Sequence, residues 1–248
     1  MWTDDTILND SSKSITCKVW VPEDIYVVLG NANKVETECY SQNCLNDKVS
    51  LLKRYGGGGT VVLHSGCIIL SLGMWVKDYF KNDLYFSLLN KSVISTLSEI
   101  NSGFKSFSQK GISDICYGDK KNIGTSLFRS RNYLLYQASI IFDPKLKLIE
   151  RYLKHPSKEP AYRKNKDHKD FLIGIKEIFP SLKQEYIKRY LDNHFIRHVQ
   201  KYMKDEMILC EPSQISNLLK RACSDRGKIS YKNNIELTKD IKSRNCDR

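Results

Sequence analysis

The chain has 248 residues, of which 41% are hydrophobic, 10% aromatic and 27% charged, with a formal net charge of +12. This length and composition suit one globular core with room for a small appended unit, and they exclude a disordered protein. No apolar stretch approaches the roughly 20 residues that span a bilayer, and the acidic start Met1–Asp5 is unlike a signal peptide, so we expect a cytoplasmic protein with no membrane partner.

Short β-rich runs alternate with turns between about Thr16 and Phe142. The expected strands are Ile25–Leu29, Val49–Leu52, Thr60–Leu63, Cys67–Leu72, Ile112–Tyr117, Ile123–Phe128 and Tyr133–Phe142. Several are continuous apolar runs, which are typical of strands covered on both faces. Helical spacing of apolar residues predicts helices over Asp83–Ile100 and Lys145–Leu153. The predicted class is α/β (α+β), with mixed, largely antiparallel sheets flanked by helices.

A proline-punctuated break, His155–Pro160, separates this part from the rest. The stretch Lys169–Met207 reads as helical, with a turn at Phe179-Pro180. Its expected apolar face consists of Leu182, Tyr186, Tyr190 and Val199. A further short helix is expected at Gln214–Ala222. We therefore predict a first unit over residues 1–155, a helical region over 156–210 and a polar basic tail, partly disordered, over 211–248.

The positive charge is concentrated in the second part of the chain. Residues 151–248 hold 23 Lys and Arg against 13 Asp and Glu, so they carry +10 of the net +12. Such a surface suits nucleic acid, an anionic membrane or an acidic protein partner. A solvated helical surface explains it as well, and we favour that over nucleic-acid binding. The eight cysteines lack a zinc-type spacing and are expected to be reduced thiols.

Four consecutive glycines, Gly56, Gly57, Gly58 and Gly59, follow the basic pair Lys53-Arg54 and precede an apolar run that ends at His64. Ordering four glycines costs entropy, and close approach of the backbone to an anionic ligand is one reason to accept that cost. The other interpretation is a loose hairpin connection between the flanking strands. The run fits neither the Walker loop nor the dinucleotide-binding glycine pattern.

A second group of chemistry-bearing residues lies downstream, between Ser113 and Thr125. Gly118-Asp119 predicts a tight turn between two strands, which would place Asp114 and Lys121 on paired strands facing one site. Gly124, at the third position after Lys121, again permits close approach of the backbone.

These motifs together resemble the lipoate–protein ligases, in the superfamily of biotin and lipoate ligases and octanoyltransferases. The resemblance is carried by Lys53-Arg54-Tyr55-Gly56-Gly57-Gly58-Gly59-Thr60-Val61-Val62-Leu63-His64, by Ser113-Asp114, by Lys121-Asn122-Ile123-Gly124-Thr125 and by the upstream strand and loop Val27–Asn33. It covers roughly residues 16–155 and implies a biotin/lipoate-ligase-like catalytic domain.

The resemblance implies ATP-dependent attachment of lipoate to a lysine through a lipoyl-AMP intermediate, with ATP and Mg²⁺. The implied partners are lipoyl acceptor domains of 2-oxoacid dehydrogenase complexes or the glycine cleavage H protein. Lys121 corresponds to the catalytic lysine and also contacts nucleotide. Asp114 corresponds to the nucleotide-side aspartate, with a metal-linked or adenosine-linked role. The substrate-binding set that the resemblance implies is Arg54, Gly56, Gly57, Gly58, Gly59, His64, Gly124 and Thr125.

One departure from the family pattern and one ambiguous segment leave alternatives open. Ser113 stands where the family usually has asparagine, and Arg129-Ser130-Arg131 either binds phosphate or solvates a strand end. One alternative is octanoyl or lipoyl transfer from a carrier protein without ATP, a branch of which uses a cysteine nucleophile; Cys116 is the candidate here. The other is a non-catalytic paralogue that binds a lipoylated partner or nucleic acid.

Overall fold

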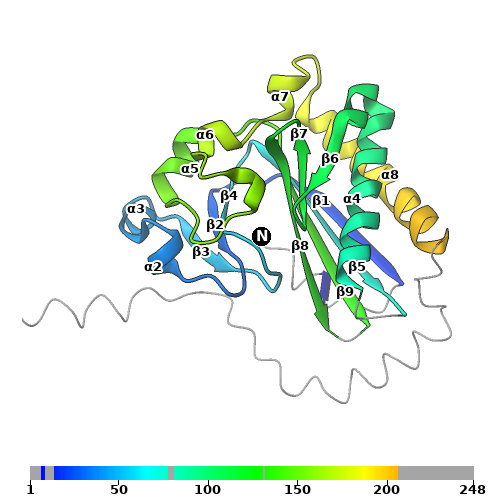
Figure 1. Ribbon diagram of the computed structural model, residues 1–248, viewed down its shortest axis with the longest axis horizontal. Helices are drawn as coiled ribbons and strands as arrows, with labels where there is room; N and C mark the ends of the chain where they lie inside the picture. Colours follow the sequence, from blue (N-terminus) through cyan, green and yellow to red (C-terminus); the bar gives the residue numbers. More distant parts are fainter. Residues whose placement is uncertain (1–6, 9–13, 78–80, 131, 206–248) are drawn as a thin grey trace, which may run out of the picture.

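Two β-sheets organise the fold (Figure 1). The computed structural model describes residues 7–8, 14–77, 81–130 and 132–205. The strands are β1 (Ile15–Trp20), β2 (Tyr26–Leu29), β3 (Ser50–Lys53), β4 (Val61–Leu63), β5 (Cys67–Trp75), β6 (Phe107–Lys110), β7 (Asp114–Tyr117), β8 (Lys120–Ser130) and β9 (Tyr133–Ile141). The helices are α2 (Val35–Glu38), α3 (Ser41–Asn46), α4 (Asn82–Ile100), α5 (Leu146–Tyr152), α6 (His168–Phe171), α7 (Ile175–Ile178) and α8 (Gln184–Asp205), with 3-10 helices η1 (Ser102–Ser106) and η2 (Ala161–Arg163).

The larger sheet has six strands in the order β1-β5-β9-β8-β7-β6, and every adjacent pair is antiparallel. The smaller sheet has the order β3-β2-β4, with β2 parallel to β3 and antiparallel to β4. The predicted class, α/β with largely antiparallel sheets flanked by helices, is confirmed. All seven expected strands are present, and the two that the sequence pattern missed, β1 and β6, lie at the edges of the larger sheet.

Helices α4 and α8 cover one face of the larger sheet (Figure 1). Residues spaced four apart on α8 form its buried stripe: Ile187, Leu191, Phe195, Val199 and Met203. The predicted apolar face was therefore wrong at Tyr186, which is 42% exposed, and at Tyr190, whose hydroxyl donates to Glu99 of α4. The observed buried stripe therefore lies one residue further along the chain than the predicted tyrosines. A tyrosine carries a hydroxyl group that needs water or a polar partner, which favours a position at the edge of the core.

The core has no break after residue 155. Ile175 of α7 and the buried stripe of α8 belong to the same hydrophobic cluster as β5, β8, β9 and α4. The predicted catalytic unit over residues 1–155 and helical region over 156–210 thus share one core as far as the structure describes the chain. The expected helix Gln214–Ala222 and the tail 211–248 lie outside the described residues.

The smaller sheet is buried on both faces. Val28 and Leu63 pack with Cys67 and Ile69 of β5, which attaches this sheet to the larger one. Successive strand residues face opposite sides. Val27, Leu29 and Leu51 therefore pack on the other side, with residues of α2, α3 and α5. Among the described residues no helix is long and apolar enough to cross a membrane, and the cysteines described, Cys17, Cys39, Cys44, Cys67 and Cys116, are all free.

Candidate functional site

The glycine run crosses the end of β2. Strands β3 and β4 flank β2 on opposite sides, so the connection from Lys53 to Val61 passes over the last residue of β2 and the loop that follows it. The two strands do not pair with each other, which excludes the hairpin interpretation. The crossing is close: a Cβ on Gly30 would lie 2.1 Å from the carbonyl oxygen of Gly58, and the Asn31 amide donates to Gly56 at 3.0 Å. The Val27–Asn33 motif and the glycine run are therefore in direct contact.

Arg54 organises the loop from within. Its side chain is buried, and its guanidinium donates to the carbonyl oxygens of Gly57 (2.6 Å), Gly59 (2.8 Å) and Val28 (3.4 Å). A planar guanidinium with several fixed donors is suited to bridging neighbouring carbonyls in this way. In this structure the cation therefore holds the glycine backbone in shape, whereas the sequence resemblance assigned it to the substrate.

The first glycine of the run packs against β8. A Cβ on Gly56 would lie 2.9 Å from the hydroxyl oxygen of Ser126, and the ring of the preceding Tyr55 lies 5.2 Å from that of Phe128. Gly57 and Gly59 are exposed, and a Cβ on either would meet no atom within 4 Å. Gly58 has φ of +95°, a conformation that favours glycine. The loop thus presents open backbone beside the outer face of β8.

Lys121 reaches the same face because of a β-bulge. Ile115 of β7 pairs with Ile123, but Cys116 pairs with Lys121, so Asn122 is the extra residue on β8. One inserted residue reverses which face the preceding side chains occupy. The amide of Asn122 fixes the bulge by donating to the carbonyl oxygens of Ile141 (2.9 Å) and Ile173 (2.8 Å). Ile123 accordingly lies in the core while Lys121 lies on the opposite face.

Gly124 provides the room that the lysine side chain needs. A Cβ at this position would lie 3.0 Å from both Cε and Nζ of Lys121. Gly124 and Ser126 are two residues apart on one face of β8, and two strand residues span about 7 Å. The lysine and the glycine loop therefore contact neighbouring positions of one strand.

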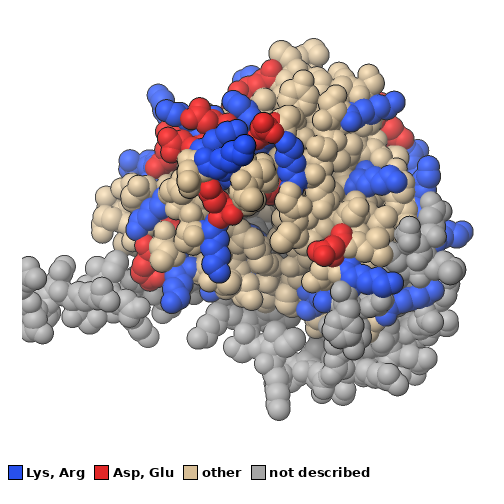
Figure 2. Space-filling model, in the orientation of Figure 1, with Lys and Arg blue, Asp and Glu red and all other residues tan. Residues whose placement is uncertain are grey.

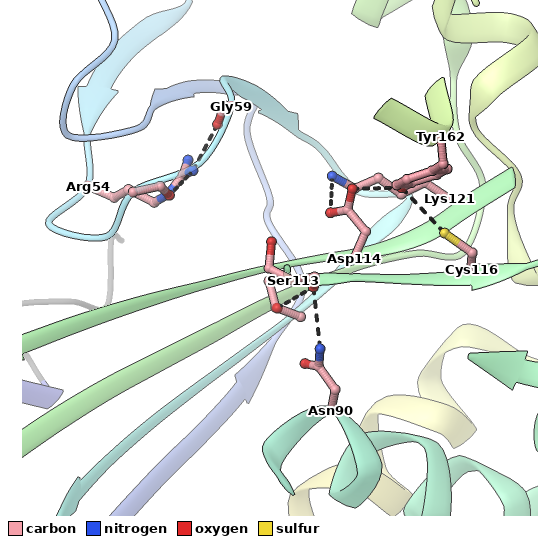
Figure 3. A network of polar contacts seen from close by, with 10 residues as sticks. Arg54, Gly59, Asn90, Ser113, Asp114, Cys116, Lys121 and Tyr162 are labelled. Carbon is pink, nitrogen blue, oxygen red and sulfur yellow. Dashed lines mark hydrogen bonds and ion pairs between the residues drawn. The ribbon is translucent and has the colours of Figure 1, made fainter. Parts of the chain in front are cut away.

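The Lys121 ammonium belongs to a partly buried polar network (Figure 3). Its Nζ lies 2.7 Å from Asp114 Oδ1, and the Tyr162 hydroxyl donates to Asp114 Oδ2 at 2.7 Å. The Cys116 thiol lies 3.4 Å from the same hydroxyl. The Lys121 and Asp114 side chains are 22% and 11% exposed. The prediction that Asp114 and Lys121 lie on paired strands and face one site is confirmed.

The glycine loop and the Lys121 network lie on the same side of β7 and β8 and face each other in the close view (Figure 3). The surface is hollowed between the part formed by the smaller sheet with α5 and α6 and the outer face of the larger sheet, with charged side chains of both signs around the opening (Figure 2). This arrangement gives a ligand an open glycine backbone on one side and an ammonium group on the other.

Besides Arg54, two residues of the sequence-based set, Thr125 and His64, act differently, and the candidate phosphate ligand Arg129 lies elsewhere. Thr125 points to the helix-covered face of β8, where its hydroxyl donates to the carbonyl oxygen of Ser113 and so fixes the start of β7. Arg129 lies four residues after Thr125 on β8, so its side chain is on the same face as Thr125 and points away from the glycine loop. His64 is buried at the turn after β4, and its Nδ1 accepts from the Gly66 amide at 3.0 Å. These contacts indicate that His64 stabilises the turn between β4 and β5.

A resident metal does not fit at Asp114. Both carboxylate oxygens are occupied, one by the Lys121 ammonium and the other by the Tyr162 hydroxyl. Within the described ranges no group of three or more His, Cys, Asp or Glu residues is placed to hold a metal ion. Mg²⁺ commonly binds through substrate phosphates and few carboxylates. Any Mg²⁺ in a reaction here is therefore best treated as part of a Mg-ATP substrate.

Cys116 is a poor nucleophile in this environment. Its side chain is fully buried, and burial is the main cause of the raised pKa of its thiol, with the Asp114 charge acting in the same direction. A thiol kept protonated and away from solvent does not supply the thiolate that transferase chemistry requires.

Sequence reasoning missed Tyr162 and the bulge at Asn122. Tyr162 is 48 residues from its partner Asp114, and no short-range spacing relates the two. Asn122 did carry a signal, because a polar amide between Lys121 and the apolar Ile123 breaks the expected alternation of a strand.

Solved structures with this fold include lipoate–protein ligases. The chain resembles a lipoate-protein ligase A bound with ATP, with a TM-score of 0.61 and 18% identity over 77% of this chain and 74% of the other. It also resembles a bi-partite lipoate protein ligase of Thermoplasma acidophilum, described with its E2 lipoyl domain, with a TM-score of 0.62 and 16% identity over 81% and 80% of the two chains. At these identities the likeness shows a shared fold.

Comparison of the sequence with protein-family models shows the family of this chain. The model of the lipoyl protein ligase A/B catalytic domain matches residues 1–196, and the chain belongs to that family. The match extends past residue 155, where the resemblance of motifs stopped. Curated relatives include inactive lipoate–protein ligase 2 of Plasmodium falciparum, 27% identical over 181 residues (60% of this chain, 47% of the relative), and lipoate-protein ligase A of Blochmanniella floridana, 20% identical over 183 residues (73% and 53%). The chain thus spans about half the length of these relatives.

Proposed function

We propose that this protein attaches lipoate to a lysine of a lipoyl acceptor domain, using ATP and passing through lipoyl-AMP. The observation that carries the proposal is the placement of the Lys121–Asp114 pair and the open glycine backbone on one face of β8. Family membership supports a ligase-type reaction, and the ATP-bound structural relative supports the nucleotide.

In the first step a lipoate carboxylate oxygen attacks the α-phosphorus of ATP, and the bond from this phosphorus to pyrophosphate breaks. The two reactants are both anionic and repel each other, so the site must supply positive charge and hold them in line. The Lys121 ammonium is proposed to supply this charge, with its direction fixed by the contacts with Asp114 and Gly124. The exposed backbone at Gly57 and Gly59 is the surface along which the acyl chain and the phosphate are proposed to lie.

In the second step the neutral amine of an acceptor lysine attacks the acyl carbonyl, an amide bond forms, and AMP leaves with the electron pair of the acyl–phosphate bond. Negative charge grows first on the carbonyl oxygen and then on the departing phosphate. The Lys121 ammonium donates to these oxygens as the charge develops, and the surplus proton of the new amide goes to solvent or phosphate. The proposed acceptors are the lipoyl domains of 2-oxoacid dehydrogenase complexes or the glycine cleavage H protein, in line with the E2 lipoyl domain of the archaeal relative.

The test is purified protein with lipoate, Mg-ATP and an acceptor lipoyl domain, followed by intact-mass measurement of the acceptor. We expect the acceptor to gain one lipoyl group, and Lys121→Ala to reduce the rate at least about a hundredfold, as loss of a key oxyanion donor does. Lipoate-dependent exchange of pyrophosphate into ATP reports the first step alone. Ligation that persists at the wild-type rate in Lys121→Ala would contradict the assignment.

A second candidate is a non-catalytic paralogue that binds lipoate or a lipoylated domain. It is favoured by the likeness to a Plasmodium relative whose name calls it inactive. This candidate predicts that lipoate or lipoylated domain binds, as measured by calorimetry, while no pyrophosphate exchange occurs. The exchange assay therefore separates the two candidates.

A further inference from the structure

Asp114 is held at both of its carboxylate oxygens. Lys121 contacts Oδ1 and the Tyr162 hydroxyl contacts Oδ2, each at 2.7 Å. A carboxylate with one partner can rotate, whereas two partners on opposite oxygens fix its plane. The plane of Asp114 in turn sets the direction in which it holds the Lys121 ammonium. The Tyr162 hydroxyl and the Lys121 ammonium share Asp114 as their partner, so the effect of Tyr162 on the lysine passes through the aspartate.

The hydroxyl acts as a donor. Burial is the largest cause of the raised pKa of Tyr162, and the neighbouring Asp114 charge adds to it, so the phenol keeps its proton. The Sγ atom of Cys116 lies 3.4 Å from the hydroxyl oxygen of Tyr162. The ring packs against the tilted ring of Phe171, with centroids 5.4 Å apart, and the Lys110 ammonium lies over it, 6.0 Å from the ring centre. The hydroxyl is therefore fixed by the packing of its own ring.

The segment that carries Tyr162 is anchored at both ends. At its beginning, the Lys154 amide donates to the carbonyl oxygen of Glu38 at 2.9 Å, and the Ser157 hydroxyl donates to the Glu38 carboxylate. At its end, the Ile173 amide donates to the backbone carbonyl of Lys121 itself at 3.0 Å. Residues 154–173 thus connect α2, beside the smaller sheet, with the strand that carries the lysine (Figure 1).

We propose that Tyr162 is a positioning residue that orients the Asp114–Lys121 pair for acyl transfer, so that residues 154–173 belong to the catalytic site. The inference rests on the proposed ligase function and deepens it. It assigns a role in the reaction to a part of the chain that the motifs had left outside the catalytic unit.

The decisive variant is Tyr162→Phe, which keeps the ring and removes the hydroxyl. Tyr152→Phe is a matched control, because the Tyr152 hydroxyl donates to Asp47 at 2.8 Å in a surface ion pair with Arg151. With Mg-ATP and lipoate, we expect Tyr162→Phe to lower kcat for pyrophosphate exchange about tenfold, the usual effect of losing one hydrogen bond to a charged group. KM for both substrates should change less than about twofold, because binding contacts stay in place. Tyr152→Phe should retain the wild-type kcat.

A double-mutant cycle tests whether the effect passes through the aspartate. In an Asp114→Asn background, adding Tyr162→Phe should change kcat by less than about twofold, because the partner charge is already gone. Effects that multiply would show that Tyr162 acts independently of Asp114 and would overturn the proposal. An unchanged kcat in Tyr162→Phe, with only a lower unfolding temperature, would overturn it as well.

A readout without turnover keeps the inference separate from the proposed function. The rate of reductive methylation of Lys121, followed by peptide mass spectrometry, reports how firmly Asp114 holds the ammonium. We expect labelling about three times faster or more in Tyr162→Phe than in wild type or Tyr152→Phe, because a freed Asp114 protects the amine less. If the wild-type protein shows no exchange, the ligase proposal fails while this measurement still decides the positioning role. Equal labelling rates in all three proteins would refute that role.

Discussion

The side chain of Lys121 lies over Gly124, within contact of the position that a Cβ would take there, and its ammonium is 2.7 Å from Asp114. Both relationships depend on the bulge at Asn122. Without that extra residue, Lys121 would share the face of Ile123 and point into the core under α4. A single insertion in one strand therefore decides whether the lysine serves a site or is buried.

Replacing Gly124 with alanine is expected to displace the lysine without unfolding the protein. The new Cβ would lie 3.0 Å from Cε and Nζ of Lys121, which are the flexible end of the side chain, so the side chain can move while the backbone stays. We expect pyrophosphate exchange to fall about tenfold or more, because a misplaced donor loses most of its effect. The unfolding temperature should change little. Retention of full exchange activity would show that Lys121 has no fixed position in the reaction.

Two neighbouring glycines of the loop should respond differently to alanine. Gly58 has φ of +95° and a Cβ there would lie 3.0 Å from Nη2 of Arg54, so Gly58→Ala should cost roughly 1–3 kcal/mol of unfolding free energy. Gly57 faces open space, and Gly57→Ala should leave stability within about 0.5 kcal/mol. If the backbone at Gly57 approaches lipoate, the same change should weaken lipoate binding, measured by calorimetry.

The converse pattern would contradict this account of the loop. A large stability loss in Gly57→Ala would mean that its open side is packed. Unchanged lipoate affinity in that variant, measured on folded protein, would mean that the ligand does not lie along the exposed glycines.

Local features of the sequence predicted much of this site, and long-range packing accounts for the rest. The pairing of Asp114 with Lys121 follows from the turn at Gly118-Asp119, which is encoded in adjacent residues. Tyr162 could not be found in this way, because the segment that carries it is placed by contacts with Glu38 and Lys121, far away in the chain.

The errors in element assignment have a similar cause. Strand β6 has one buried residue in four, so its sequence lacks the alternation of a covered strand. The buried stripe of α8 was misplaced by one position because aromatic residues at helical spacing were taken for core, whereas Tyr190 uses its hydroxyl to bind Glu99 at the surface.

Stability should fall as the pH is lowered from 7.5 to 5.5. Burial lowers the pKa of His64 below its ordinary value near 6.5, and His168 is shifted in the same direction for the same reason. Above pH 7 both residues are neutral in the folded and unfolded chains. As the pH falls through 6.5, these histidines become protonated in the unfolded chain but stay neutral in the folded chain. The free energy of unfolding therefore decreases until the pH reaches the lowered pKa values of the folded state.

The variant His64→Asn should reduce this pH dependence by removing one of the two contributions. An asparagine oxygen can accept the Gly66 amide two residues on, as in an Asx turn, so the turn should persist despite a lower stability at every pH. Urea unfolding at pH 7.5 and 5.5 measures the slope. An unchanged slope in the variant would show that His64 titrates alike in both states.

Replacing Cys116 with alanine should leave ligation within about twofold of the wild-type rate and cost about 1 kcal/mol of stability, because a buried sulfur and a weak contact with Tyr162 are lost. Cys67→Ala is a suitable control, since Cys67 is also buried and burial raises its thiol pKa to about 12.

A cysteine-dependent transferase makes the opposite prediction: transfer would stop in Cys116→Ala alone, and the wild-type protein incubated with an acyl carrier would gain an acyl thioester. Intact-mass measurement of both proteins separates the mechanisms. Because Cys116 lies behind Tyr162 and is closed off from solvent, an acyl group could reach its sulfur only if residues 154–173 moved away, and the Lys121–Asp114 pair would lose its second support at the same moment.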